Sequence, residues 1–177
     1  MTNSTAGARN GVDIHLAAKA RIPNRPTRSV VHGTFHLERV YDASAARVWT
    51  ALTDPAAKSL WFGAASEQVE IIERELDVRP GGRERLRGNW GGQVVSTFDA
   101  IYYDVIENER LVYCYEMHLD DRKISVSVAT ILLKAEGRQT RIIVTEQGAF
   151  LDGYDDAGSR ERGTNDLLDA LGASLTP

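Results

Sequence analysis

The fold of this chain is decided by residues 111–134, which read LVYCYEMHLDDRKISVSVATILLK. Two runs rich in β-branched and aromatic residues, 111–119 and 123–134, flank a short polar turn, and this pattern predicts paired antiparallel strands. One face of the first run carries Leu111, Tyr113, Tyr115 and Met117, and the other carries Val112, Cys114, Glu116 and His118. Since the first set is larger and more apolar, we expect it to face the core.

Further strand signals lie on both sides of this pair. The runs with strand composition are 30–41, 67–78, 83–90, 94–106 and 140–150. Most are separated by short turns, such as Pro80-Gly81-Gly82 and Gly91-Gly92, so we expect a meander of antiparallel neighbours. Neither glycine pair precedes a helix, as a phosphate-binding loop must.

Helices are predicted at two places. Residues 45–52 follow a plausible N-cap at Ser44, and a second short helix starts at Pro55 behind Asp54 and ends near Gly63. After Gly153 a longer helix carries an apolar stripe made of Leu167, Leu168, Leu171 and Leu175. Strands followed by a segregated helix indicate the α+β class, with the long helix across the concave face of a curved sheet.

Residues 1–29 differ from the rest of the chain. They carry Pro23, Pro26, small polar residues and scattered arginines, without a sustained apolar stripe. We predict an N-terminal extension, flexible or docked, before a single domain at 30–177. A mitochondrial-type presequence is the alternative, because arginines outnumber acidic residues in this segment.

Composition excludes several classes of function. The 177 residues fit one domain with a core, and the net charge of −4 argues against a general nucleic-acid binder. No apolar run is long enough for a secretory signal or a membrane span. The single cysteine, Cys114, excludes an intramolecular disulfide and a multi-cysteine zinc cluster. We therefore predict a soluble cytoplasmic protein.

Metal and cofactor sites are not predicted. His32 and His36 share a strand face but stand about 13 Å apart, which is too far for one metal ion. Cys114 and His118 have the same spacing, so they do not form a catalytic cysteine–histidine pair. No serine lies in a nucleophile elbow.

An ordered series of short motifs crosses most of the chain. They are Val40-Tyr41-Asp42-Ala43, Val48-Trp49, Leu52-Thr53-Asp54-Pro55, Trp61-Phe62-Gly63, Asp77-Val78-Arg79-Pro80-Gly81-Gly82, Glu109-Arg110-Leu111-Val112-Tyr113 and Thr140-Arg141-Ile142. In this order the set resembles the family of homologues of the activator of heat-shock protein 90 ATPase, within the START-like (SRPBCC) superfamily. The resemblance runs from about Thr34 to Leu175.

The resemblance implies a helix-grip fold, in which a curved antiparallel sheet wraps round a long C-terminal helix. Superfamily members typically hold hydrophobic or amphipathic small molecules in a cavity between sheet and helix, and some are cyclases or hydrolases. This chain has Gly163-Thr164 where family members often carry an aromatic residue after the glycine, which would enlarge or reshape the cavity. The family's name-giving proteins use a separate client-contacting domain, and an arm of about 29 residues is too short to be one. No chaperone partner is therefore predicted.

The candidate ligand-binding residues are Trp61, Phe62, Trp90, Tyr113, Tyr115, Met117 and Glu146. The two tyrosines either pack the core or line a pocket in which their hydroxyls orient a ligand. Trp61 and Phe62 either plug the core or form one lip of an entrance. Trp90 either caps the sheet or joins the site as a weaker candidate.

Glu146 is the candidate catalytic residue if the protein is an enzyme. It lies in phase with Ile142 and Val144, so its carboxylate is expected to face the core, where it is costly unless paired. The alternatives are a salt bridge with Arg83, Arg85 or Arg87, a polar anchor for a ligand, or an acid/base group. We predict a small-molecule binding domain, with a polyketide cyclase- or hydrolase-like enzyme as the alternative.

The run 123–134 is apolar on both faces. Its second face carries Val126, Val128, Thr130 and Leu132, and a solvent-facing side would be more polar. We therefore predict a homodimer that buries part of this face. The alternative cover is the segment 1–29.

Overall fold

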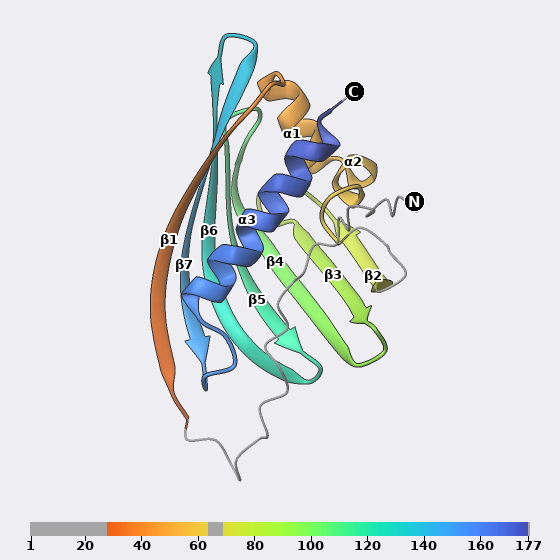
Figure 1. Ribbon diagram of the computed structural model, residues 1–177, viewed down its shortest axis with the longest axis vertical. Helices are drawn as coiled ribbons and strands as arrows, with labels where there is room; N and C mark the ends of the chain where they lie inside the picture. Colours follow the sequence, from red (N-terminus) through yellow and green to blue (C-terminus); the bar gives the residue numbers. More distant parts are fainter. Residues whose placement is uncertain (1–27, 64–68, 177) are drawn as a thin grey trace, which may run out of the picture.

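The computed structural model describes residues 28–63 and 69–176 (Figure 1). The elements are β1 (Val30–Tyr41), α1 (Ala45–Thr53), α2 (Pro55–Ser59), β2 (Val69–Leu76), β3 (Arg83–Trp90), β4 (Val94–Ile106), β5 (Arg110–Leu119), β6 (Arg122–Glu136), β7 (Gln139–Leu151) and α3 (Ala157–Ser174). The strands form one antiparallel sheet in the order β1-β7-β6-β5-β4-β3-β2. This arrangement confirms the predicted α+β architecture and agrees with a helix-grip fold.

The observed boundaries follow the predicted ones closely. Ser44 caps α1 by accepting a hydrogen bond from the Arg47 amide, and Asp54 caps α2 by accepting one from the Ala57 amide. The main difference is at the end of α2, which stops at Ser59 rather than near Gly63. Residues 60–63 instead form a turn, in which Gly63 has a left-handed φ of 61°.

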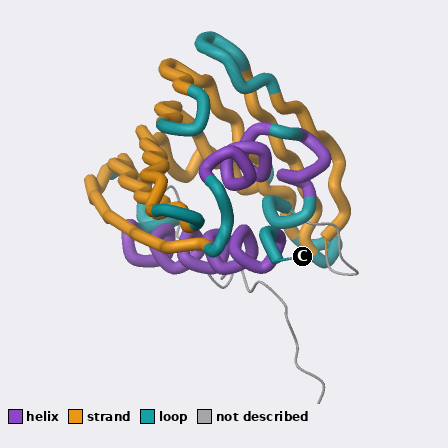
Figure 2. Tube along the Cα trace, turned by 90° about the horizontal axis from the view of Figure 1, so that it is seen from above, coloured by secondary structure: helices purple, strands orange, loops and turns teal. Residues whose placement is uncertain are grey.

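β1 pairs with β7, which is remote from it in the sequence. The antiparallel register runs from Val30 opposite Leu151 to Tyr41 opposite Thr140. Seen from above, the strands curve around the side of the sheet that carries the helices (Figure 2). Alternation sends every second side chain to this inner face. The core there contains Phe35, Leu37, Val48, Leu52, Leu111, Ile131, Ile142, Val144 and Leu171.

α3 follows β1 along the inner face of the sheet. At one end, a Cβ placed on Gly33 would lie 2.5 Å from the Cβ of Ala157, so only glycine permits this approach. At the other end, Tyr41 packs against Gly172 and donates a hydrogen bond of 2.7 Å to the carbonyl of Leu168. The helix therefore covers the β1 side of the sheet most closely.

Few of the residues in the predicted N-terminal extension belong to the described part of the chain. The Arg28 guanidinium and the Ser29 amide both contact the Asp152 carboxylate, at 2.8 Å each. The predictions of a flexible or docked arm and of a presequence concern residues 1–27, which lie outside the described residues. Within the described residues, no helix is both long and apolar enough to cross a membrane.

Candidate functional site

The inner face of β4 and β5, together with the turn after α2, carries a set of partly buried apolar side chains. We call Phe62, Phe98, Tyr113 and Met117 the aromatic surface. The Phe62 and Phe98 rings meet edge to face, with centroids 5.3 Å apart, and the Phe98 and Tyr113 rings lie 6.4 Å apart. These separations fall in the range of favourable aromatic pairs. The four residues therefore form a continuous apolar surface on the concave side of the sheet.

A buried polar cluster supports one end of this surface. Lys58 of α2 forms an ion pair of 2.7 Å with Glu84 of β3, and the Tyr102 hydroxyl of β4 donates a hydrogen bond of 2.5 Å to the same carboxylate. The Lys58 ammonium also lies 5.1 Å from the centroid of the Phe62 ring. Burial, followed by the charge of Glu84, raises the pKa of Tyr102, so its hydroxyl stays protonated. The cluster fixes α2 against the sheet and so positions Phe62.

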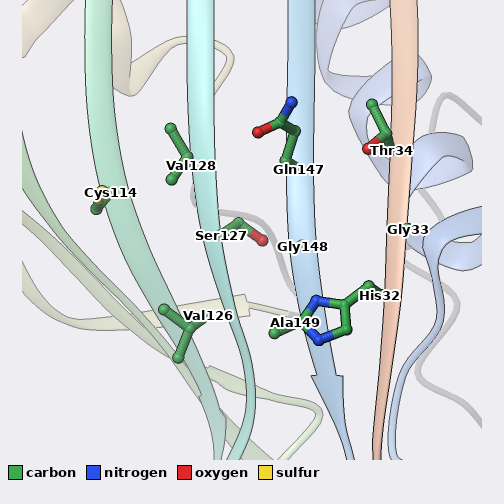
Figure 3. Close-up of a pocket in the computed structure, with 10 residues that line it drawn as sticks. All are labelled: His32, Gly33, Thr34, Cys114, Val126, Ser127, Val128, Gln147, Gly148 and Ala149. Atoms are coloured by element: carbon green, nitrogen blue, oxygen red, sulfur yellow. The ribbon is translucent and has the colours of Figure 1, made fainter.

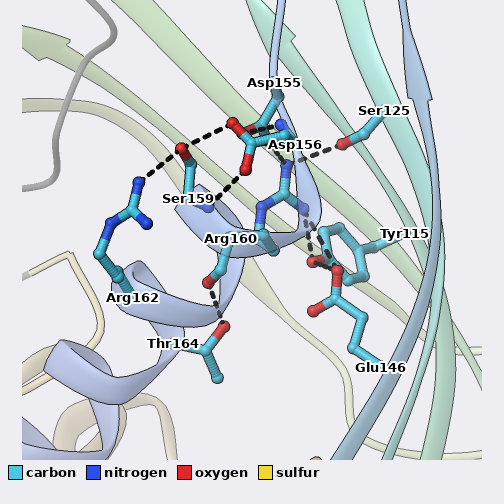
Figure 4. A network of polar contacts seen from close by, with 9 residues as sticks. All are labelled: Tyr115, Ser125, Glu146, Asp155, Asp156, Ser159, Arg160, Arg162 and Thr164. Carbon is cyan, nitrogen blue, oxygen red and sulfur yellow. Dashed lines mark hydrogen bonds and ion pairs between the residues drawn. The ribbon is translucent and has the colours of Figure 1, made fainter. Parts of the chain in front are cut away.

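A second polar cluster joins the first turn of α3 to the sheet (Figure 4). The Arg160 guanidinium donates hydrogen bonds to the Tyr115 hydroxyl at 2.6 Å, to Ser125 at 2.8 Å and to Asp155 at 2.5 Å. The Tyr115 hydroxyl in turn donates to Glu146 at 2.6 Å, and Arg160 lies 3.5 Å from the same carboxylate oxygen. Every charged member is largely buried, so the pairing offsets a substantial desolvation cost.

The electrostatics of this second cluster follow from its burial. Desolvation raises the pKa of Glu146, although the charge of Arg160 and the hydrogen bond from Tyr115 oppose the shift. Burial acts against the charge of Arg160, but Tyr115, Asp155 and Glu146 together raise its pKa. Arg160 therefore remains charged and holds two carboxyl groups beside the start of α3.

Tyr113 and Tyr115 differ in what their hydroxyls contact. The Tyr115 hydroxyl accepts from Arg160 and donates to Glu146. The Tyr113 hydroxyl makes no hydrogen bond to a described residue, and burial raises its pKa well above the usual value. Tyr113 is crowded by protein atoms, yet part of its surface remains accessible.

The structure brings most of the predicted site residues to the inner face. Phe62, Tyr113 and Met117 lie on the aromatic surface, and Tyr115 and Glu146 lie in the second polar cluster. The predicted inward face of 111–119 is therefore confirmed. Their role as a ligand site stays a prediction at this point.

The two predicted tryptophans have other surroundings. Trp61 is 8% exposed and donates a hydrogen bond of 2.8 Å from Nε1 to the carbonyl of Ala51, so it packs as a plug beside Phe62. Trp90 lies at the hairpin end of β3 and donates to the Ser96 hydroxyl at 2.6 Å. Among the described residues, no ring contact joins Trp90 to the aromatic surface.

The salt bridge of Glu146 has a different partner from the predicted one. Glu84 is the buried residue of its stretch of β3, so alternation turns Arg83 and Arg85 to the outer face, where Arg83 pairs with Asp99. Glu146 pairs instead with Arg160 from α3. The expected partnership with Arg83, Arg85 or Arg87 is therefore wrong, because strand alternation separates these groups.

Sequence reasoning missed several residues of the inner face. Phe98 and Tyr102 share one face of β4 with Ala100, and the alternation applied to 111–119 could have found them. Lys58 and Arg160 carry no such signal, because each acts through a helix whose position depends on contacts remote in sequence. Their roles required the three-dimensional structure.

Open space borders α3 at Gly163. A Cβ added to Gly163 would meet no atom within 4 Å. Gly163 lies one turn after Arg160 and one turn before Leu167, and both of these face the core. The absence of a side chain therefore leaves room on the flank of the helix, whereas the expected effect of Gly163-Thr164 on a cavity stays a prediction.

Two surface hollows lie elsewhere. A groove of about 530 Å³ runs over the outer face of β1, β7, β6 and β5, where His32, Thr34, Val126, Val128 and Gln147 line it (Figure 3). The other lies beside the loops that hold Arg28, Asp152 and Tyr154. Neither lies between the sheet and α3, so the predicted internal cavity stays a prediction.

Comparison with known proteins places these features in context. The family model described as Activator of Hsp90 ATPase homolog 1-like protein matches residues 42–176. A structural-genomics protein from Rhizobium leguminosarum is 40% identical, with a TM-score of 0.79, over 84% of this chain and 97% of its own. The Mll3558 protein from Rhizobium loti is 39% identical, with a TM-score of 0.77, over 82% of this chain and 99% of its own.

A more distant solved structure shares only the fold. DynU16, described as a protein in the dynemicin biosynthetic locus, is 17% identical with a TM-score of 0.57, over 80% of this chain and 46% of its own. No curated protein matches the chain.

Proposed function

The chain belongs to the Activator of Hsp90 ATPase homolog 1-like family, within the START-like (SRPBCC) superfamily, and on this premise we propose that it binds a hydrophobic or amphipathic small molecule. The ligand would lie against the aromatic surface, between α3 and the inner face of β4 and β5. The observation that carries this proposal is the partial exposure of Phe62, Phe98, Tyr113 and Met117 on the concave side of the sheet.

Burial of this surface supplies the driving force for binding. Apolar area removed from water stabilises a complex by roughly 25 cal/mol per Å². The surrounding parts are already fixed, because Lys58 holds α2 and Arg160 holds α3 through ion pairs to the sheet. A preorganised surface loses little conformational freedom when the ligand binds.

The charges around the aromatic surface favour an uncharged ligand. Lys58 is paired with Glu84, and Arg160 is paired with Glu146 and Asp155. Both cations are therefore already committed to carboxylates of the protein. A ligand with a strongly charged group would have to compete for them.

The test compares two substitutions at Gly163. Native mass spectrometry and thermal shift against a panel of lipids, polyketides and aromatic metabolites should identify ligands of the wild type. Gly163→Trp places an indole in the open space on the flank of α3 and should abolish binding of every ligand found. Gly163→Ala is the matched control and should bind as the wild type does. Unchanged binding by Gly163→Trp would contradict the proposed location.

A polyketide cyclase- or hydrolase-like enzyme is the second candidate. Burial raises the pKa of Glu146, which brings a carboxyl group closer to the range useful for proton transfer at neutral pH. Against this, the Glu146 side chain is 4% exposed and already contacts Tyr115 and Arg160. In the enzyme case, Glu146→Gln should abolish turnover while the melting temperature stays within a few degrees. Ligand binding without turnover in the wild type would favour the binding protein.

We also propose that a second copy of the chain covers the outer face of β6. Val126 and Val128 point outward and are 44% and 42% exposed, beside the partly buried Leu132. Adjacent exposed apolar side chains on a sheet suit a two-fold interface. Light scattering at micromolar concentration should give a dimer for the wild type and a monomer for Val128→Glu. A monomeric wild type would contradict the dimer and leave residues 1–29 as the alternative cover.

The cytoplasmic location predicted from the sequence remains part of the proposal. Fractionation of cells that express the tagged protein, followed by immunoblotting of each fraction, would test it.

A further inference from the structure

We infer that Tyr113, and not its neighbour Tyr115, donates the hydrogen bond that orients the ligand, and that the ligand carries an uncharged acceptor such as a carbonyl group. The inference rests on the proposed function, because it assigns a role within the same inner face. It separates two tyrosines that are equivalent in the sequence pattern. Both lie on the inward face of β5, and their ring centroids are 6.0 Å apart.

Tyr115 has no proton left to donate to a ligand. Its hydroxyl accepts one hydrogen bond from Arg160 and donates its proton to Glu146, and the residue is 7% exposed. A hydroxyl has one proton, so a ligand acceptor would have to displace Glu146. Displacement would leave a buried carboxylate with one fewer partner, which is strongly unfavourable.

Tyr113 has the opposite situation. Its hydroxyl has no hydrogen-bond partner among the described residues, and the rings around it belong to Phe98, Tyr102 and Tyr115. The Tyr102 hydroxyl gives its proton to Glu84, and no hydrogen bond joins it to the Tyr113 hydroxyl. A hydroxyl without a protein partner can give its proton to a ligand acceptor without breaking a hydrogen bond of the protein.

The direction of the hydrogen bond follows from the surroundings of Tyr113. Burial, with the nearby Tyr115, Glu84 and Glu146, raises the pKa of the Tyr113 hydroxyl, so it is protonated at neutral pH and can donate. The same carboxylates disfavour an anionic acceptor. An aromatic molecule with a carbonyl group therefore fits best, because its rings can pack on Phe62 and Phe98 while its oxygen meets Tyr113.

The experiment uses two probes of nearly the same shape, 2-acetylnaphthalene and 2-isopropenylnaphthalene, in which a carbonyl oxygen is replaced by a methylene carbon. Their dissociation constants are measured for the wild type, Tyr113→Phe and Tyr115→Phe by titration calorimetry. Tyr103→Phe on the outer face is the neutral control, since Tyr103 is 62% exposed. The ratio of ketone to alkene affinity cancels the difference in hydrophobicity between variants.

We expect Tyr113→Phe to lower this ratio by about 5- to 10-fold, which corresponds to one neutral hydrogen bond. Its melting temperature should stay within about a degree of the wild type, because no described hydrogen bond is lost. Tyr115→Phe should keep the wild-type ratio but melt several degrees lower, because it breaks the contacts with Arg160 and Glu146.

The outcomes separate the inference from the proposed function. If both probes bind and Tyr113→Phe leaves the ratio unchanged, Tyr113 does not orient the ligand, although the binding function stands. If the ratio falls in Tyr115→Phe instead, Tyr115 and not Tyr113 orients the ligand. Failure of both probes to bind the wild type would contradict the proposed function itself.

Discussion

The inner face of the sheet has two halves that differ in how they are covered. On the β1 side, α3 seals the sheet through the Gly33–Ala157 approach and the Tyr41 hydrogen bond to Leu168. On the β4 and β5 side, the aromatic surface stays partly accessible, although the polar clusters at its margins are buried and joined by hydrogen bonds. The sealed half is therefore where the helix packs on the sheet, and the accessible half is where we propose that the ligand binds.

The largest expected effect comes from breaking the polar cluster at the border between the two halves. Arg160→Ala leaves Glu146 and Asp155 without their cation, and the loss of one partner from a buried pair costs about 3–5 kcal/mol of unfolding free energy. Chemical denaturation measures this loss. Arg162→Ala, on the exposed side of the same turn, is the control and should change stability by less than about 0.5 kcal/mol. Equal effects of the two substitutions would contradict the role given to Arg160.

The next effect concerns the sealed half alone. Gly33→Ala places a Cβ 2.5 Å from the Cβ of Ala157, so α3 must move away from β1 at a cost of about 1–3 kcal/mol. Thermal unfolding should show the loss. Ala157→Gly in the same molecule removes the collision, and the double variant should regain most of the stability. If the double variant is no more stable than Gly33→Ala, the close contact with Ala157 is not the reason that position 33 requires glycine.

A smaller effect of opposite sign is expected on the accessible half. Gly163→Ala adds a methyl group to open space in a helix interior and should raise the unfolding free energy by about 0.5–1 kcal/mol. The increase should appear in the melting temperature without any ligand. A decrease would show that the flank of α3 beside the accessible half is packed rather than open.

The smallest expected effect is a dependence on pH. Because burial raises the pKa of Glu146 in the folded protein, the folded state binds its proton more tightly than the unfolded state does. Stability therefore falls as pH rises above the ordinary value of 4.5 and through the raised pKa. Between pH 4 and pH 8, the melting temperature of the wild type should fall relative to that of Glu146→Gln as pH increases. If the melting temperature of the wild type instead rises relative to that of Glu146→Gln as pH increases, folding lowers the pKa of Glu146 rather than raising it.

The same contrast explains how much the sequence could predict. The inward faces of β5 and β6 and the inward direction of Glu146 follow from alternation, which depends only on neighbours along one strand. The pairing of Glu146 with Arg160 depends on where α3 crosses the sheet and how it is rotated, and contacts at Gly33 and Gly172 set both. Roles that arise within a strand were therefore predictable, whereas the ion pairs that Lys58 and Arg160 bring to the sheet from docked helices were not.

The pairing of β1 with β7 has a consequence for how the chain folds while it is being synthesised. His36 and Thr145, which bond across these two strands, are 109 positions apart in the sequence. β1 leaves the ribosome early, but its partner strand is translated only after the whole meander from β2 to β6. Closing so long a loop is slow compared with forming the local hairpins. β1 is thus without its partner for longer than the strands of the local hairpins are, and until β7 is made its backbone edge stays open to mispairing.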